Sequence, residues 1–259
     1  MTQPSQFVQC VPFVQRTARF LADWVIPDTC VLCHLPLAKH SWHEPLELAD
    51  HLCAHCRVAV TLNHQPCSHC ALPLPQGQTI CGRCSVSPLA DYALAPVLHQ
   101  HCGAHLIKRL KFHQGEREAQ ALCSFMLTGV HLSYPDRESL PDYLVPVPID
   151  PRTMLSRGFN QAYWLAQPLG KRLGIPILAG SFKRKNGPSQ RNQTRAARMQ
   201  LPAQTFTARR FEHLKKQLEQ RHVAIVDDVL TTGSTARVLT KKLRQAGAKR
   251  VDVWVATRA

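Results

Sequence analysis

A polar loop near the C-terminus has the composition of a phosphate-binding site. It consists of Thr231, Thr232, Gly233, Ser234 and Thr235, and it follows an apolar run and precedes a stretch with helical periodicity. Backbone N–H groups at a helix N-terminus have no internal partner, and the helix dipole favours an anion there. Gly233 permits a close backbone approach, and the hydroxyls add donors. The sequence therefore predicts a phosphate cradle.

Two adjacent carboxylates, Asp227 and Asp228, stand immediately upstream of this loop. They would repel a phosphate, so they are expected to accept hydrogen bonds from ribose hydroxyls, or to hold metal-bound water, while the loop binds a 5′-phosphate. The loop is neither a GxxxxGK[ST] nor a GxGxxG motif. An acidic strand end followed by a Ser/Thr helix cap is the ordinary alternative, but the full run from Val223 to Thr235 is far more specific.

A strand–helix–strand unit must position this loop. Residues 223–226 are an apolar run with β-branched residues, which is typical of a buried parallel strand that ends at the two aspartates. Apolar residues then recur at helical spacing up to Gly247, a plausible helix stop. Val251, Val253 and Val255 alternate as a second strand. The loop is therefore expected at the carboxyl end of the first strand.

Four CxxC pairs form a second group of residues suited to chemistry. Each pair places two thiolates on one tight turn, and two pairs complete a tetrahedral Cys₄ site of the kind that binds structural zinc. A redox CxxC of the thioredoxin type would need a single motif at a strand–helix junction. The predicted zinc ligands, for two sites, are Cys30, Cys33, Cys53, Cys56, Cys67, Cys70, Cys81 and Cys84.

The way in which the pairs combine stays open. Gaps of 19 and 10 residues suit pairing of the first with the second and the third with the fourth, but interleaved pairing is an alternative. Seven histidines in this region are alternative ligands, yet eight paired cysteines suffice for two sites. Cys10, Cys102 and Cys123 lie outside any pair and are expected to be small buried side chains.

The charge is divided unevenly between the two halves of the chain. The net charge of +15 over 259 residues falls on residues 101–259, which carry +16, whereas residues 1–100 carry −1. Residues 150–221 hold 15 basic and three acidic residues. A solvated surface, an arginine-bearing lid over a pyrophosphate and a single-stranded DNA track are the three interpretations of this stretch.

The composition and hydropathy also exclude several classes of protein. With 44% hydrophobic and 19% charged residues the chain is globular. No apolar run reaches the roughly 18–20 residues that a bilayer requires, and the N-terminus does not resemble a secretory signal. We therefore expect a cytoplasmic protein without membrane insertion, with an amphipathic helix over 1–27, a double zinc ribbon over 28–88 and an α/β domain over 89–259.

The run VAIVDDVLTTGST resembles the PRPP-binding motif of type I phosphoribosyltransferases. VPVP at 145–148, RGFNQA at 157–162, an arginine-rich loop and this motif follow one another behind the CxxC array. In this order they resemble the competence protein F (ComF/ComFC, GntX-like) family over the chain after about residue 28. The resemblance implies a type I phosphoribosyltransferase-like parallel sheet domain, preceded by a small Cys₄ double zinc-ribbon module.

The resemblance also implies roles for the site residues. Asp227 and Asp228 would contact the ribose hydroxyls of PRPP or another ribose 5-phosphate ligand, and residues 231–235 its 5′-phosphate. Mg²⁺ would accompany PRPP, and Arg109 is a further plausible pyrophosphate contact. The candidates for the pyrophosphate or its lid are Lys111, Arg152, Arg157, Arg191, Arg195 and Arg198.

Three functions follow as alternatives. The family is implicated in natural competence and in the use of DNA as a nutrient, so the first is a DNA uptake or utilisation factor that binds PRPP and single-stranded DNA. The second is an active, magnesium-dependent phosphoribosyltransferase in nucleotide metabolism. The third is a zinc-dependent scaffold that joins DNA-uptake machinery proteins, with ligand binding as a regulatory input. No residue of the sequence stands out as a general base.

Overall fold

The computed structural model describes residues 29–37, 51–112, 115–184 and 202–259. The predicted N-terminal helix over 1–27 and the lid candidates Arg191, Arg195 and Arg198 lie outside these residues, as does Cys10. The elements, in chain order, are α2 (Ala54–Val58), α3 (Gly82–Val86), β1 (Tyr92–Leu94), β2 (Val97–Leu98), α4 (His101–Phe112), α5 (Glu116–Ser133), β3 (Tyr143–Pro146), α6 (Pro151–Arg157), α7 (Gln161–Leu173), β4 (Phe182–Arg184), a 3₁₀ turn (Ala203–Thr205), β5 (Phe206–Ala208), α9 (Phe211–Leu218), β6 (His222–Leu230), α10 (Ser234–Gln245) and β7 (Arg250–Arg258).

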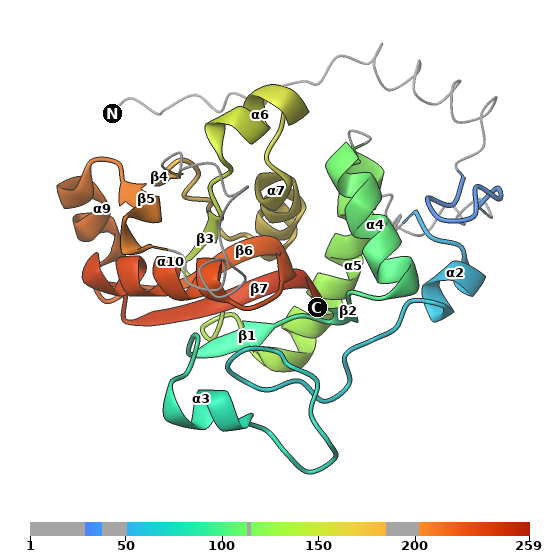
Figure 1. The fold of residues 1–259 in the computed structure, drawn as a ribbon, viewed down its shortest axis with the longest axis horizontal. Helices are drawn as coiled ribbons and strands as arrows, with labels where there is room; N and C mark the ends of the chain where they lie inside the picture. The colour runs from blue at the N-terminus through green and yellow to red at the C-terminus, as the bar shows by residue number, and fades with distance from the viewer. Residues whose placement is uncertain (1–28, 38–50, 113–114, 185–201) are drawn as a thin grey trace, which may run out of the picture.

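A parallel sheet forms the centre of the molecule (Figure 1). Its strands run in the order β1-β7-β6-β3, and β2 continues beside β7 after β1. The two central strands, β6 and β7, are largely buried, which explains why valine, isoleucine and alanine make up half of their residues. The short strands β4 and β5 form a separate antiparallel pair.

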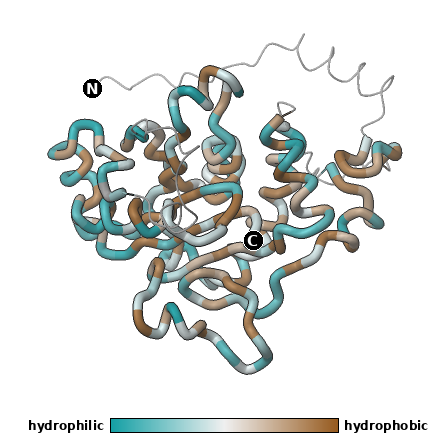
Figure 2. The backbone as a smooth tube through the Cα atoms, viewed as in Figure 1, coloured by the Kyte–Doolittle hydropathy of each residue, from teal (hydrophilic) through white to brown (hydrophobic). Residues whose placement is uncertain are grey.

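Helices cover both faces of the sheet, as a parallel sheet requires. On one face α4, α5 and α7 pack against Ala224, Val226 and Trp254; on the other face α9 and α10 pack against Val223 and Ile225, among others. The helices alternate between hydrophobic and hydrophilic segments in Figure 2. This alternation is expected of helices that bury one side against a sheet.

The α/β class and the parallel strand–helix–strand unit are therefore confirmed, with one difference in the first strand. The sequence predicted that this strand ends at the two aspartates, whereas β6 continues through them to Leu230. The reason is pairing: Val229 and Leu230 pair with Thr257 and Arg258 of β7. The loop is accordingly shorter than expected, and Ser234 and Thr235 already belong to α10.

Two small cysteine-centred units precede the sheet. Each contains a knuckle closed by an isolated antiparallel bridge, Thr29 with Pro36 in the first and Pro66 with Pro73 in the second. Each then contributes a short helix, α2 or α3, whose N-cap is a cysteine. In Figure 1, α2 lies on the side of α4, and α3 lies beyond β1.

A buried polar cluster joins the elements at the amino end of the sheet. The Asp252 side chain is fully buried and accepts hydrogen bonds from Tyr134 Oη at 2.7 Å, His222 Nε2 at 2.7 Å and Arg250 Nε at 3.1 Å. Trp254 Nε1 in turn donates to Tyr134 Oη at 2.9 Å. Burial, together with the Asp252 charge, raises the pKa of Tyr134, so that this hydroxyl remains a donor.

We expect Asp252→Ala to lower the free energy of unfolding by about 3–5 kcal/mol, because it leaves buried donors of Tyr134 and His222 without an acceptor. Urea denaturation followed by circular dichroism would measure the loss. Arg244→Ala is the control, since it removes the exposed Arg244–Asp91 ion pair, and such pairs contribute at most about 1 kcal/mol. Equal losses in the two variants would contradict a structural role for the cluster.

Candidate functional site

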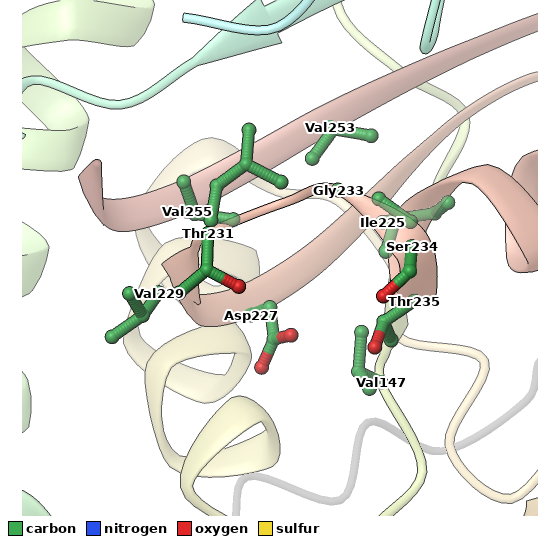
Figure 3. A pocket seen from close by; sticks show the side chains of 12 residues that line it. Val147, Ile225, Asp227, Val229, Thr231, Gly233, Ser234, Thr235, Val253 and Val255 are labelled. Atoms are coloured by element: carbon green, nitrogen blue, oxygen red, sulfur yellow. The ribbon is translucent and has the colours of Figure 1, made fainter. Parts of the chain in front are cut away.

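The loop between β6 and α10 forms an open cradle at the carboxyl edge of the sheet. Gly233 is the N-cap of α10 and has φ 78°, a left-handed conformation that favours glycine. Gly233 has no side chain that could cap the helix. The Ser234 N–H donates to Thr232 Oγ1 at 3.4 Å, and the next N–H groups of the first turn remain available to a ligand. In Figure 3 the hydroxyls of Thr231, Ser234 and Thr235 face a common space.

The Asp227 carboxylate faces the same space (Figure 3). Its Oδ1 accepts a hydrogen bond from the backbone N–H of Asp228 at 2.9 Å. Burial, followed by the neighbouring Asp228 charge, raises the pKa of Asp227 well above its usual range, and Lys111 opposes this shift. Asp227 Oδ1 thus accepts a hydrogen bond beside the β6–α10 loop.

Successive side chains of a strand point to opposite faces, so the two aspartates diverge, although Asp228 remains close enough to raise the pKa of Asp227. Asp227 lies on the α10 face, whereas Asp228 lies on the α4 face, where only 5% of it is exposed. There Lys111 Nζ lies 2.6 Å from Asp228 Oδ2. The structure thus brings Lys111 to the acidic pair and neutralises one of the two charges.

His99 is a residue of this edge that the sequence analysis missed. It follows β2, and its Nδ1 lies 3.2 Å from Thr257 Oγ1, which donates to the Asp228 carbonyl at 3.3 Å. Burial and the Lys111 charge lower the pKa of His99, against the opposing charge of Asp228. The position of His99 directly after an apolar strand could have indicated a site residue, but the chain contains 14 histidines and this one does not stand out among them.

Of the other predicted pyrophosphate contacts, the three in the described ranges, Arg109, Arg152 and Arg157, do not line the space around the loop. Arg109 Nε pairs with Glu118 Oε1 at 2.8 Å, and Arg157 Nη1 donates to Gln161 Oε1 at 2.6 Å. Arg152 is exposed on α6, which the sequence analysis did not predict and which buries none of its residues. Asp150 caps this helix by accepting the Arg152 backbone N–H at 2.9 Å.

The eight paired cysteines form two clusters. One combines Cys30, Cys33, Cys53 and Cys56, and the other combines Cys67, Cys70, Cys81 and Cys84. Within each cluster the sulfurs lie within 4.8 Å of one another, which corresponds to the sequential pairing and not to the interleaved one. Neither of the two clusters in the described part of the chain includes a histidine.

The sulfur positions fit structural zinc. A tetrahedral zinc with Zn–S bonds of about 2.3 Å places its sulfurs about 3.8 Å apart. The Cys33–Cys53 and Cys70–Cys81 sulfur pairs are each separated by 3.7 Å. Backbone N–H groups also point at the sulfurs, as in the 3.3 Å hydrogen bond from Cys81 N to Cys67 Sγ. Of the lone cysteines, Cys123 is fully buried and Cys102 is partly exposed.

Comparisons with known proteins agree with this arrangement. The model of the double zinc ribbon domain family matches residues 21–85. DNA utilization protein YhgH of Escherichia coli K12 is 32% identical over 256 residues, covering 88% of this chain and 96% of the relative. Competence protein F of Haemophilus influenzae is 31% identical over 231 residues, covering 80% of this chain and 96% of the relative.

The chain belongs to the competence protein F family. This confirms the resemblance that the motif order indicated. Competence protein ComFC of Bacillus subtilis is a more distant relative, 26% identical over 141 residues, which cover 54% of this chain and 53% of the relative. The competence protein F family thus combines, in this chain, a double zinc ribbon with a parallel-sheet domain.

Two solved structures overlap part of this competence protein F family member. An allosteric regulatory enzyme of purine biosynthesis is 17% identical, with a TM-score of 0.36, over 58% of this chain and 30% of that one. A purine phosphoribosyltransferase from Pyrococcus horikoshii is 20% identical, with a TM-score of 0.32, over 53% of this chain and 84% of that one. At this level of similarity, neither structure supports a function for this chain.

None of the helices in the described ranges combines the length and the apolar character that crossing a bilayer requires.

We expect Asp227→Asn to raise the free energy of unfolding at pH 7 by about 1–2 kcal/mol. The folded-state pKa of Asp227 is raised, so the ionised carboxylate destabilises the folded protein above that pKa. The gain should shrink as the pH falls through this pKa, because the wild-type side chain then becomes neutral. Urea denaturation at several pH values would measure it, and exposed Glu212→Gln is the charge-matched control. A variant less stable than the wild type at pH 7 would contradict this electrostatic account.

Proposed function

We propose that this protein acts in DNA utilisation and that the β6–α10 loop binds a ribose 5-phosphate ligand, PRPP with Mg²⁺ in the first instance. The observation that carries the proposal is the shared space in Figure 3. There the N-terminus of α10, with the left-handed Gly233 as its N-cap, and the Asp227 carboxylate border the same space. Each of these features suits a different part of such a ligand.

The 5′-phosphate fits the cradle, because α10 offers N–H donors and the favourable end of its dipole. The ribose fits Asp227, because a carboxylate accepts hydrogen bonds from two neighbouring hydroxyls. Asp228 is already paired with Lys111, so Asp227 is the acceptor that we assign to the sugar. Mg²⁺ would enter with the diphosphate of PRPP and supply charge neutralisation there.

Two observations support a role in DNA utilisation. The relatives that cover most of the chain are named DNA utilization protein and competence protein F. In addition, residues 183–198 contain six basic residues and no acidic residue. We propose that Arg191, Arg195 and Arg198 contact the phosphates of single-stranded DNA, whereas a contact with DNA-uptake proteins through the zinc module is the alternative.

We expect isothermal titration calorimetry to show that the wild-type protein binds PRPP in the presence of Mg²⁺, and ribose 5-phosphate without it. Asp227→Asn should weaken both by about tenfold, because it replaces a charged acceptor. Gly233→Ala should weaken them at least as much, since Gly233 has positive φ and its added Cβ would lie 2.9 Å from Leu89 Cδ1.

The controls for this experiment are Glu212→Gln and Gly77→Ala, the latter at a positive φ of 85° with open space around it. Both should bind as the wild type does. Absence of binding by the wild type would refute the proposed ligand, and undiminished binding by Asp227→Asn would refute the assignment of the ribose. Release of pyrophosphate during the titration would reveal hydrolysis of PRPP, with water as the acceptor of the phosphoribosyl group.

For DNA, we expect an oligothymidylate to bind with an affinity that falls as the salt concentration rises. Replacing Arg191, Arg195 and Arg198 with glutamine should reduce the slope of log K against log[salt] by about 2, since each lost phosphate contact on a single strand removes about 0.7. Fluorescence anisotropy would measure both. The triple variant of Lys241, Lys242 and Lys249 is a control of equal charge, and an equal effect of that control would leave only non-specific attraction.

A further inference from the structure

Arg258 of β7 connects the second cysteine cluster with the phosphate loop. Its Nε donates to the carbonyl of the cluster residue Cys70 at 3.1 Å, and its Nη1 donates to the carbonyl of Leu230 at 2.9 Å. Leu230 is the last residue of β6, directly before the loop. One guanidinium therefore holds the backbone of a cysteine knuckle and the start of the loop at a fixed separation, as a rigid fork of donors can.

The segment that follows Cys84 covers the outer side of the same loop. Leu89 is buried and lies against Gly233 so closely that a Cβ at this glycine would meet it at 2.9 Å. Arg237, in the first turn of α10, donates from Nη1 to Ser87 Oγ at 3.0 Å. The loop is thus bounded by Asp227 on one side and by the second cysteine unit on the other.

The second cysteine unit and the loop line the same pocket. Its lining includes Cys70, Cys81 and Cys84 together with Thr231, Thr232 and Gly233. The cluster itself has little apolar support, because the residues that pack with its cysteines are few and include Leu74. A unit with so small a core depends on its metal for its conformation.

The first cysteine cluster has different neighbours. Val31 N donates to the His51 carbonyl at 2.9 Å, and His51 Nε2 lies 2.7 Å from Gln120 Oε1 of α5. Cys30 and Cys56 belong to the hydrophobic core formed with α4 and α5. The described contacts of this cluster are therefore with helices on the α4 face, on the other side of the sheet from α10.

We propose that metal bound at the second cluster, by Cys67, Cys70, Cys81 and Cys84, holds the phosphate loop in its ligand-binding conformation through Arg258 and Leu89, so that metal binding and ligand binding are coupled. The coupling to ligand binding rests on the proposed function, whereas the effect of the metal on the conformation of the loop does not. Arg258 and Leu89 are positioning residues, since they act on the loop backbone. The first cluster is not coupled and serves as an internal reference.

Coupling between two sites is reciprocal. If the metal favours the binding conformation of the loop, then a ligand on the loop must favour retention of the metal by the same factor. The ligand should therefore protect four of the eight cluster cysteines and leave the other four unchanged. A purely structural zinc site remote from the loop would show no such selectivity.

The first experiment measures zinc release from the wild-type protein, which we expect to hold two zinc ions per chain. Release to a coloured zinc chelator is followed with and without ribose 5-phosphate, a probe that needs no Mg²⁺. Alkylation of the freed thiols and mass spectrometry identify the cluster. At equilibrium with the chelator, we expect the ligand to raise the zinc affinity of the second cluster by about fivefold or more and to leave that of the first unchanged.

Variants separate the coupling from a general loss of structure. Arg258→Ala and Leu89→Ala should weaken binding of ribose 5-phosphate by about fivefold or more and abolish the selective protection. Arg244→Ala is the matched control, because Arg244 of α10 binds Asp91 at 2.7 Å, close to the same unit but distant in sequence from the loop. It should behave as the wild type does. Circular dichroism and zinc content verify that each variant is folded.

Hydrogen exchange tests the same coupling without a ligand. Selective loss of zinc from the second cluster should increase amide exchange in residues 231–236, whereas loss from the first should not. Unchanged exchange in the loop would overturn the proposal. If the exchange increases but ribose 5-phosphate does not bind, the proposed ligand is wrong and the link between metal and loop stands. If the wild type binds and the Arg258→Ala and Leu89→Ala variants bind equally well, the link is refuted and the ligand stands.

Discussion

The pairing of β6 with β7 is the constraint on which the site depends. It continues past both aspartates, so that Leu230 lies opposite Arg258 and the loop must turn within three residues to enter α10. So short a turn requires the left-handed conformation at Gly233 and leaves the N-terminus of α10 open. The same register sends Asp227 and Asp228 to opposite faces of the strand. The positions of the cradle, the free carboxylate and the carboxylate paired with Lys111 all follow from it.

Much of this edge could be predicted from sequence. Buried valines and alanines specify β6 and β7, and helical periodicity specifies α10, because these signals are local. The extension of β6 to Leu230 could not be predicted, since two aspartates resemble the end of a strand and only pairing with Thr257 and Arg258 overrides them. Helix α6 buries no residue and thus has no periodic signal, although Asp150 and Pro151 form a capped start. The partner of Lys111 could not be inferred either, because residues 111 and 228 meet only through packing of α4 on the sheet.

The two ends of the sheet differ in their electrostatics. At the amino end Asp252 is fully buried and accepts hydrogen bonds from Tyr134, His222 and Arg250, which favours one rigid arrangement. At the carboxyl end Asp227 has a raised pKa and an unfilled space in front of it. A polar cluster with all its hydrogen bonds made contributes to stability, whereas an acceptor that lacks donors reduces it until a ligand supplies them. The cysteine units add a second source of rigidity, one that depends on metal.

The contact between Arg258 and Cys70 spans 188 residues of sequence. During synthesis on the ribosome the cysteine units emerge long before β7 does, and they contain the ligands needed to take up metal at once. The loop, by contrast, reaches its final conformation only after nearly the last residue of this chain has joined the sheet. A chain that lacks β7 would therefore contain both cysteine clusters but not the Arg258 contact with Leu230 at the start of the loop.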